Sequence, residues 1–150
     1  MHDSNFIYAD FILTIQRLSQ TFTALLKHEC TDLTLSDINF HQALYMLYLV
    51  EQKDVVYIED RKINRKNFYY TVNKLHKLEY INVEFNGKFI KNIDPTRKGQ
   101  RVIDALHKIF DKQLRQLLFN GMIVTELSHI LTLIYRFEKF WLNQIYSKIE

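Results

Sequence analysis

Apolar residues recur at helical spacing near both ends of the chain, at intervals of three or four residues. The first stripe lies in residues 5–28 and consists of Tyr8, Phe11, Ile15, Leu18, Phe22 and Leu25. The second lies in a segment ending near Ile149 and consists of Ile123, Leu127, Ile130, Ile134, Phe137 and Trp141. Such heptad-like stripes predict long amphipathic helices that pack against other helices. An internal core helix would explain part of the first stripe equally well.

Two shorter helical patterns lie between these ends. Ser36 or Thr34 can cap a helix that runs to about Gln52. Its expected inward residues are Phe40, Ala43, Leu44, Leu47 and Tyr48. A later helix is expected to begin at Asp94-Pro95-Thr96, which offers a cap and a fixed φ, and to end near Phe119.

The segment from Arg61 to Leu78 is basic throughout, with six Lys or Arg residues, one His and no carboxylate. With Asn64 as its N-cap, helical spacing divides it into two faces. The apolar face comprises Phe68, Val72, Leu75 and Leu78. The opposite face comprises Lys66, Asn67, Tyr70, Asn73, Lys74 and Lys77. Long cations, carboxamides and a phenol neutralise phosphates and bind base edges, so the segment predicts a DNA-recognition helix. An ordinary basic surface helix is the alternative.

Two short alternations of apolar and polar residues follow, over Ile81–Phe85 and Phe89–Ile93. Asn86-Gly87 between them supplies the positive φ that a two-residue hairpin turn needs. A basic helix followed at once by a hairpin is the outline of a winged helix. The first helix of a helix-turn-helix should lie between the short β-like run Val55–Ile58 and Lys62, which leaves room for about one helical turn.

Composition and charge favour one mainly α domain that binds a polyanion. The chain has 150 residues, of which 47% are hydrophobic, and only three Gly and one Pro interrupt its helices. Residues 61–101 hold 11 Lys or Arg against three Asp or Glu, whereas the rest of the chain holds 9 against 14. This polarised charge suits nucleic acid. An anionic membrane is the competing partner, but the basic helix lacks the broad apolar face of interfacial helices, so no membrane partner is expected.

No constellation in the sequence indicates catalysis. Phosphate-binding glycine loops, nucleophile elbows and H-E-x-x-H motifs are missing, and the six histidines show no strong metal spacing. One cysteine excludes a disulfide framework within the chain. The N-terminus has no signal-peptide features, and no apolar run approaches the length of a membrane span. We therefore expect a cytoplasmic protein that is not an enzyme and has no cofactor and no metal.

In the order of its elements the chain resembles the MarR family of dimeric bacterial transcription regulators. The most specific match runs from Asn67 to Leu75 and through Leu78-Glu79-Tyr80-Ile81. This stretch is similar to the recognition helix and the start of the wing in alphaproteobacterial MarR-like regulators. Thr96-Arg97-Lys98-Gly99 matches the family's Thr-x-x-Gly after the wing.

Two positions depart from the family pattern. The family's wing usually carries Asp-x-Arg with an arginine that enters the minor groove, whereas this wing offers Asn86-Gly87-Lys88 and Lys91. Glu79 stands where Gly is common before the wing.

The resemblance implies a winged helix-turn-helix with N- and C-terminal dimerisation helices. Residues 1–150 would form a single domain, with dimerisation helices at about 5–30 and 100–150 and the DNA-binding core at 35–99. The implied function is sequence-specific binding of duplex DNA, at a pseudo-palindromic operator, by a homodimeric transcriptional regulator. The expected dimer interface consists of Tyr8, Phe11, Ile15, Leu18, Phe22, Ile134, Phe137, Trp141 and Ile145.

The recognition helix, at about 64–78, is expected in the major groove, and the wing, 81–93, on the backbone or in the minor groove. The candidates for reading bases are Lys66, Asn67, Tyr70 and Asn73, with Asn64 and Tyr69 beside them. The candidates for neutralising phosphates are Arg61, Lys62, Arg65, Lys74, Lys77, Lys88 and Lys91. The alternative function is a MarR-like protein-interaction module without sequence-specific DNA reading.

A sensor site is a further hypothesis, and a small-molecule effector is left open as a partner. Zinc-sensing members of the resembled family use Cys and His ligands from places similar to those of Cys30, His41 and His107, with Asp111 on the same helix face as His107. The favoured interpretation is instead that Cys30 is a small buried apolar residue and that the histidines are unconnected. Cys30 could alternatively sense oxidants if its pKa were lowered.

Overall fold

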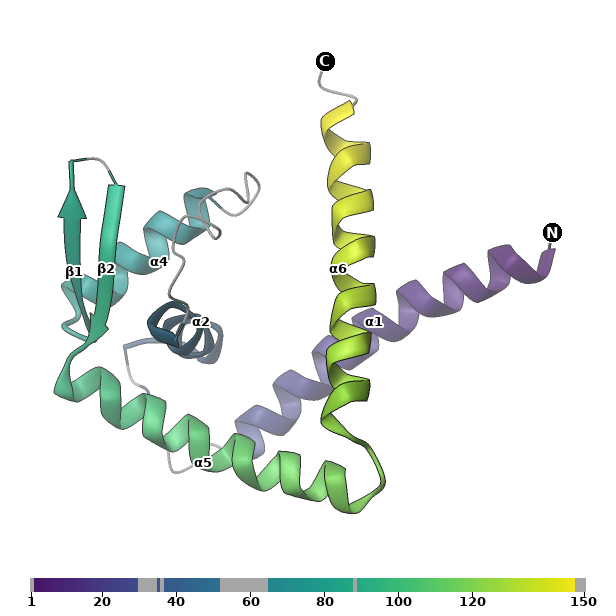
Figure 1. Ribbon diagram of the computed structural model, residues 1–150, viewed down its shortest axis with the longest axis horizontal. Coiled ribbons are helices and arrows are strands. Elements are labelled where there is room, and N and C mark those ends of the chain that lie inside the picture. The colour runs from purple at the N-terminus through teal and green to yellow at the C-terminus, as the bar shows by residue number, and fades with distance from the viewer. Residues whose placement is uncertain (1, 30–34, 36, 52–64, 88, 148–150) are drawn as a thin grey trace. The chain divides into compact units, whose positions relative to one another are not determined.

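The computed structural model describes residues 2–29, 35, 37–51, 65–87 and 89–147 (Figure 1). Its helices are α1 (His2–Glu29), α2 (Phe40–Glu51), α4 (Arg65–Lys77), α5 (Arg97–Phe119) and α6 (Val124–Ser147), and its strands are β1 (Ile81–Asn86) and β2 (Phe89–Pro95). The prediction of a mainly α chain with a small hairpin after the basic helix is confirmed. The predicted run Val55–Ile58 and the first helix of the helix-turn-helix lie outside the described residues.

The chain divides into two compact units, Met1–His107 and Lys108–Glu150, and α5 begins in the first and continues in the second. In the first unit α2, α4, the hairpin and the start of α5 contribute to one apolar core. Its side chains include Ala43, Met46, Leu49, Phe68, Val72, Leu75, Tyr80, Ile81, Ile90, Ile93, Val102, Ile103 and Leu106. The predicted apolar face of the basic helix is therefore confirmed for Phe68, Val72 and Leu75, while Leu78 is half-buried.

The start of α2 is fixed by a reciprocal pair of hydrogen bonds. The Gln42 N–H donates to Asn39 Oδ1 at 2.8 Å, and the Asn39 N–H donates to Gln42 Oε1 at 3.1 Å. This capping box satisfies two backbone donors that the helix itself leaves unpaired. The prediction of Ser36 or Thr34 as the cap is therefore wrong, because the capping residue is Asn39.

The inward face of α2 also differs from the prediction. Met46 and Leu49 are buried, whereas Tyr48 is exposed and Leu44 and Leu47 are only half-buried. This short helix carries apolar residues on most of its sides, so their spacing alone does not predict which side is buried.

The end of α4 is a Schellman motif with Glu79 in the left-handed region. The Glu79 N–H donates to the His76 carbonyl at 3.0 Å, and the Tyr80 N–H donates to the Leu75 carbonyl at 2.9 Å. Glu79 has a φ of 63°. This explains why glycine suits the position, since a side chain in left-handed backbone costs about 1–2 kcal/mol.

The hairpin turn lies one residue later than predicted. Asn86 pairs with Phe89 as the last pair of the two strands, so Asn86 belongs to β1 and the turn begins at Gly87. Gly87 supplies the positive φ, at 64°. The predicted turn at Asn86-Gly87 is therefore wrong in register.

One strand of the hairpin carries a β-bulge close to this turn. Glu84 pairs with Asn92, but the next residue of β1, Phe85, pairs with Ile90. Lys91 is thus an extra residue without a partner across the ladder. A bulge of this kind increases the local twist and redirects side chains.

Thr96 caps α5 and holds its first turn against the end of α4. Within the predicted Asp94-Pro95-Thr96 the capping residue is Thr96, because the Gly99 N–H donates to Thr96 Oγ1 at 3.1 Å, and Pro95 is the last residue of β2 and not the first of the helix. A Cβ on Gly99 would lie 2.0 Å from the Tyr80 carbonyl oxygen. The spacing Thr-x-x-Gly therefore combines a cap with a close backbone approach.

The second unit contains the remainder of α5 and all of α6. Gly121, with a φ of 93°, ends α5 through bonds from its own N–H to Leu118 and from the Met122 N–H to Leu117, both at 3.1 Å. This is the same Schellman geometry as at Glu79, built here with the expected glycine.

Glu79→Gly is expected to raise the free energy of unfolding by about 1 kcal/mol, because glycine adopts the left-handed region without a steric cost. Urea denaturation at one fixed protein concentration measures the change. Glu79→Ala is the matched control, since it removes the carboxylate but keeps the Cβ. An equal gain in both variants would assign the effect to charge and contradict the backbone explanation.

Candidate nucleic-acid interface

The outer face of α4 is polar, aromatic and open to solvent. Tyr70 is 63% exposed, Asn73 and Lys77 are exposed, and Lys74 is half-buried. On the opposite side of the helix, Phe68, Val72 and Leu75 are buried in the core. Helical periodicity thus separates an anchoring face from a presenting face, as the sequence predicts.

The presenting face borders a hollow of about 410 Å³. It is lined by Tyr70, Asn73, Lys74, Lys77 and Leu78. A carboxamide and a phenol that point into open space can exchange hydrogen bonds with base edges, and two ammonium groups at the rim can meet phosphates.

The other predicted contact residues of this region fall into two groups. Arg61, Lys62, Asn64 and Lys88 lie outside the described residues, as do the side chains of Arg65, Lys66 and Asn67. Tyr69 is half-buried, and its ring lies edge-on to Phe68 with centroids 5.2 Å apart. Tyr69 therefore belongs to the border of the presenting face and supports Phe68 from the side.

The hairpin contributes little net charge. Lys91, predicted to neutralise a phosphate, is exposed and lies with its Nζ 3.5 Å from Glu84 Oε1. An exposed ion pair of this kind contributes little to stability. However, the carboxylate offsets much of the positive potential that Lys91 would offer a phosphate.

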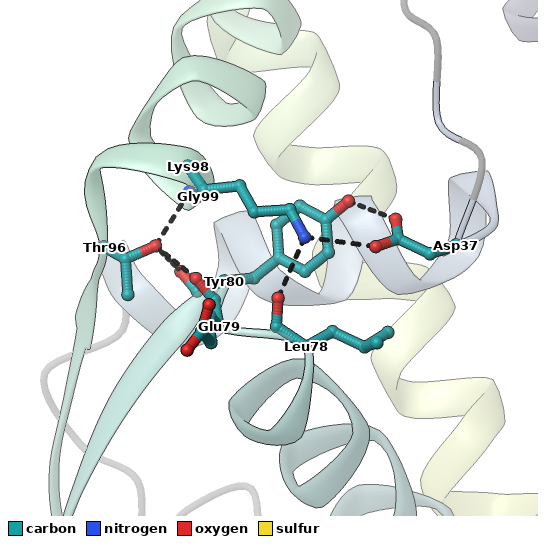
Figure 2. Close-up of polar contacts among 7 residues, drawn as sticks. All are labelled: Asp37, Leu78, Glu79, Tyr80, Thr96, Lys98 and Gly99. Carbon is teal, nitrogen blue, oxygen red and sulfur yellow. Dashed lines mark hydrogen bonds and ion pairs between the residues drawn. The ribbon is translucent and has the colours of Figure 1, made fainter.

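A polar cluster fixes the direction in which the chain leaves α4 (Figure 2). The Tyr80 hydroxyl donates to Asp37 Oδ1, and Lys98 Nζ lies 3.1 Å from Asp37 Oδ2. Lys98 also donates to the Leu78 carbonyl at 2.9 Å and lies 4.2 Å from the centroid of the Tyr80 ring. The cluster thereby ties the segment before α2 to the end of α4 and the start of α5.

The cluster perturbs the acidity of two of its members. The hydrogen bond from Tyr80 lowers the pKa of the Asp37 carboxyl below its ordinary value of 3.8, burial opposes this, and Lys98 lowers it further. Burial raises the pKa of Tyr80 from 10.0 to about 12, and the Asp37 carboxylate adds to the rise. The anchoring contacts are therefore intact at neutral pH.

A second hollow, of about 610 Å³, lies where α4, β1 and α5 meet. Its lining includes His76, Lys77, Asn82, Arg97 and Lys98. Lys77 borders both hollows, so the basic surface extends past the end of α4. Arg97 is not among the residues that the sequence predicts to contact DNA. Its place in the Lys- and Arg-rich range 61–101 was the available indication in the sequence, but its location beside α4 follows only from the fold.

Of the proposed sensor residues, the structure describes His41 and His107 but not Cys30. Cys30 lies outside the described residues, His41 stacks on Tyr45 with centroids 6.3 Å apart, and His107 Nε2 lies 2.6 Å from Glu51 Oε1. The part of the chain that the structure describes contains no group of three or more His, Cys, Asp or Glu residues that could hold a metal ion. His107 thus contacts α2, whereas His41 contacts a residue of its own helix.

No single described helix is long and apolar enough to cross a membrane; only the bent pair of α5 and α6 meets that test jointly, by length and composition.

Three solved structures resemble the chain. The transcriptional regulator SlyA gives a TM-score of 0.62 at 19% identity, over 94% of this chain and 99% of that one. FabT of Streptococcus pneumoniae, solved in complex with DNA, gives 0.54 at 18% identity, over 89% and 98%. The MarR family transcription regulator SP03579 gives 0.55 at 16% identity, over 95% and 94%. At these identities the likeness establishes the fold, and the predicted winged-helix class is confirmed.

No protein-family model matches the sequence, and no curated protein gives a significant match.

Tyr80→Phe is expected to lower the free energy of unfolding by about 1 kcal/mol at neutral pH, because the Asp37 hydrogen bond is lost. In the native protein the contribution of Tyr80 is fully present below pH 10.0 and is lost as the pH rises toward about 12, since only the unfolded tyrosine ionises in that window. The variant should lack this alkaline loss. Below about pH 3.8, where protonation of Asp37 removes stability from the native protein, the variant should also lose less.

Urea denaturation across the two pH windows measures both effects. Tyr70→Phe is the matched control, because the Tyr70 side chain is exposed on α4. Identical pH profiles for Tyr80→Phe and the native protein would contradict the assigned role of the hydroxyl.

Proposed function

We propose that the protein is a sequence-specific, duplex-DNA-binding transcriptional regulator that acts as a homodimer and carries out no catalysis. One observation carries the proposal: α4 presents Tyr70, Asn73 and Lys77 outward while its opposite face is locked into the core. The similar structures add support, since SlyA and SP03579 are transcription regulators and FabT was solved with DNA.

In this proposal α4 lies in the major groove, which is wide enough to admit one helix. Asn73 and Tyr70 would contact base edges, because a carboxamide can pair with adenine and a phenol can donate or accept. Lys66 and Asn67, one turn closer to the start of α4, would belong to the same set. The hairpin would lie on the backbone or in the minor groove.

The cations near α4 would position the protein on the phosphates. Lys74 and Lys77 border the presenting face and Arg97 extends it, while Arg61, Lys62, Arg65, Lys88 and Lys91 remain proposed contacts. Each neutralised phosphate releases condensed counterions, so affinity should fall steeply as salt rises. A MarR-like interaction module would show no such dependence.

The homodimer is proposed from apolar surface that a monomer leaves uncovered. Among the 24 residues of α6 none is buried, and Leu133, Phe137 and Phe140 line an apolar hollow of about 420 Å³ with Arg136. In α1, Leu18 is 62% exposed. The residues predicted for the interface are all exposed or half-buried: Tyr8, Phe11, Ile15, Leu18, Phe22, Ile134, Phe137, Trp141 and Ile145. Apolar surface of this extent is typical of protein interfaces.

Replacing Lys74 or Lys77 by Ala should weaken binding to all duplexes about equally and reduce the slope of log affinity against log salt by about one per residue. Filter binding or fluorescence anisotropy across a salt series measures both quantities. Lys139→Ala is the control, because Lys139 is exposed on α6 outside the basic segment. Equal slopes for all three variants and the native protein would remove the phosphate assignment.

Asn73→Ala and Tyr70→Ala should instead change which sequences are preferred, at about 1–3 kcal/mol for each lost base contact. Selection from a random-sequence duplex pool, carried out in parallel with the native protein and each variant, measures the preference. Unchanged selected sequences in both variants would contradict the placement of α4 in the major groove.

Ile134→Glu is expected to dissociate the dimer, because a carboxylate would be buried without a partner in the interface. Sedimentation at micromolar concentration should show a dimer for the native protein and a monomer for the variant. DNA affinity should fall by at least about tenfold, since two half-sites can no longer be bound together. Lys139→Glu, on the side of α6 opposite Ile134, should leave both properties unchanged. A folded native monomer would refute the proposal.

A further inference from the structure

The apolar face of the hairpin continues beyond the core that supports it. Ile81, Val83 and Phe85 alternate along β1 and so share one face of the strand. Ile81 is buried, Val83 is half-buried and Phe85 is 53% exposed. The same face that packs on the core at the base of the hairpin therefore ends in an open phenylalanine near the turn.

The location of Phe85 makes this ring the projecting apolar group of the described wing. Only the pair Asn86–Phe89 separates it from the turn, and a Cβ on Gly87 would meet no atom within 4 Å. Figure 1 shows that the turn is the end of the hairpin farther from α5, which adjoins the base. The bulge at Lys91 lies directly beside the Phe85–Ile90 pair, where it can redirect the ring.

Charge gives the hairpin no net attraction for phosphate. From Ile81 to Pro95 its two lysines are balanced by Glu84 and Asp94, and the sequence contains no arginine there. Lys91 already lies 3.5 Å from Glu84. A contact between this hairpin and DNA must therefore draw mainly on apolar surface and hydrogen bonds.

We infer that Phe85 makes an apolar contact in the minor groove of the bound duplex, against deoxyribose and the edges of a base step. The inference rests on the proposed function, since it requires α4 to occupy the adjacent major groove. The chain leaves α4 for β1 within three residues, and the two elements pack together, so the hairpin flanks the same stretch of DNA. The carbons of deoxyribose can cover the part of the Phe85 ring that the protein leaves exposed. Apolar side chains can also enter partly unstacked base steps from the minor groove.

Phe85→Ala is therefore expected to lower affinity for a duplex selected by the native protein by about tenfold, the scale of one lost aromatic–base contact. The factor should be the same at every salt concentration, because no phosphate contact is lost. Phe85→Leu should retain most of the affinity. Asn92→Ala is the matched control, since Asn92 is exposed on β2, pairs with Glu84 and lines neither hollow of the interface.

A second readout locates the contact. The adenine analogue 2-aminopurine is placed in the selected duplex outside the segment protected by α4. If a base step there unstacks, its fluorescence should increase when the native protein binds. The increase should be smaller with Phe85→Ala. If the native protein binds DNA and Phe85→Ala gives the same affinity and the same 2-aminopurine fluorescence, the inference is wrong. The proposed function would then still stand. Native protein that binds no duplex would instead defeat the proposed function itself.

Discussion

The fold around α4 depends on the contacts of one residue, Tyr80. Its N–H closes the Schellman motif on Leu75, and its carbonyl oxygen accepts from the Thr96 N–H at 3.0 Å. Its hydroxyl holds Asp37, while its ring lies beneath the ammonium of Lys98. Because both backbone groups and the side chain are engaged, the direction of the chain after α4 has little freedom. The orientation of the hairpin relative to α4 follows from that constraint.

This constraint has a functional consequence under the proposed role. A recognition helix and a wing bind one duplex together more tightly when the angle between them is fixed beforehand. Otherwise the protein would lose conformational entropy on binding, because binding would have to fix that angle. The cluster of Asp37, Tyr80 and Lys98 presets it without using any residue of the presenting face of α4. Substitutions at the base-reading positions of this chain would therefore leave that support unchanged.

Much of this arrangement is predictable from the sequence, because it depends on local periodicity. The two faces of α4, the hairpin after it and the cap at Thr96 all follow from spacing within a few residues. The turn register and the buried face of α2 do not. In the hairpin, Asn86 is equally suited to a strand end or a turn, and its pairing with Phe89 places it at the strand end. In α2, apolar residues surround the helix, so only tertiary contacts select Met46 and Leu49.

The candidate site divides in the same way. Tyr70, Asn73 and Lys77 are predictable because one helix presents them. Arg97 and the members of the Tyr80 cluster are brought to α4 from more distant positions, Asp37 being 43 residues before Tyr80. No pattern over a few neighbouring residues predicts such long-range contacts. The exposure of Phe85 is also not predictable from the sequence, because its alternation with Ile81 and Val83 predicts that it is buried.

The state of α6 has a consequence for how the chain acquires its structure. A helix of 24 residues with none of them fully buried gains little stability from tertiary packing, and its β-branched and aromatic residues lower its intrinsic propensity. Its helix–coil equilibrium is then linked to whatever covers its apolar side. Under the proposed homodimer, the helicity of α6 should vary with the occupancy of that surface, so folding of α6 and association of the two chains would be one thermodynamic event.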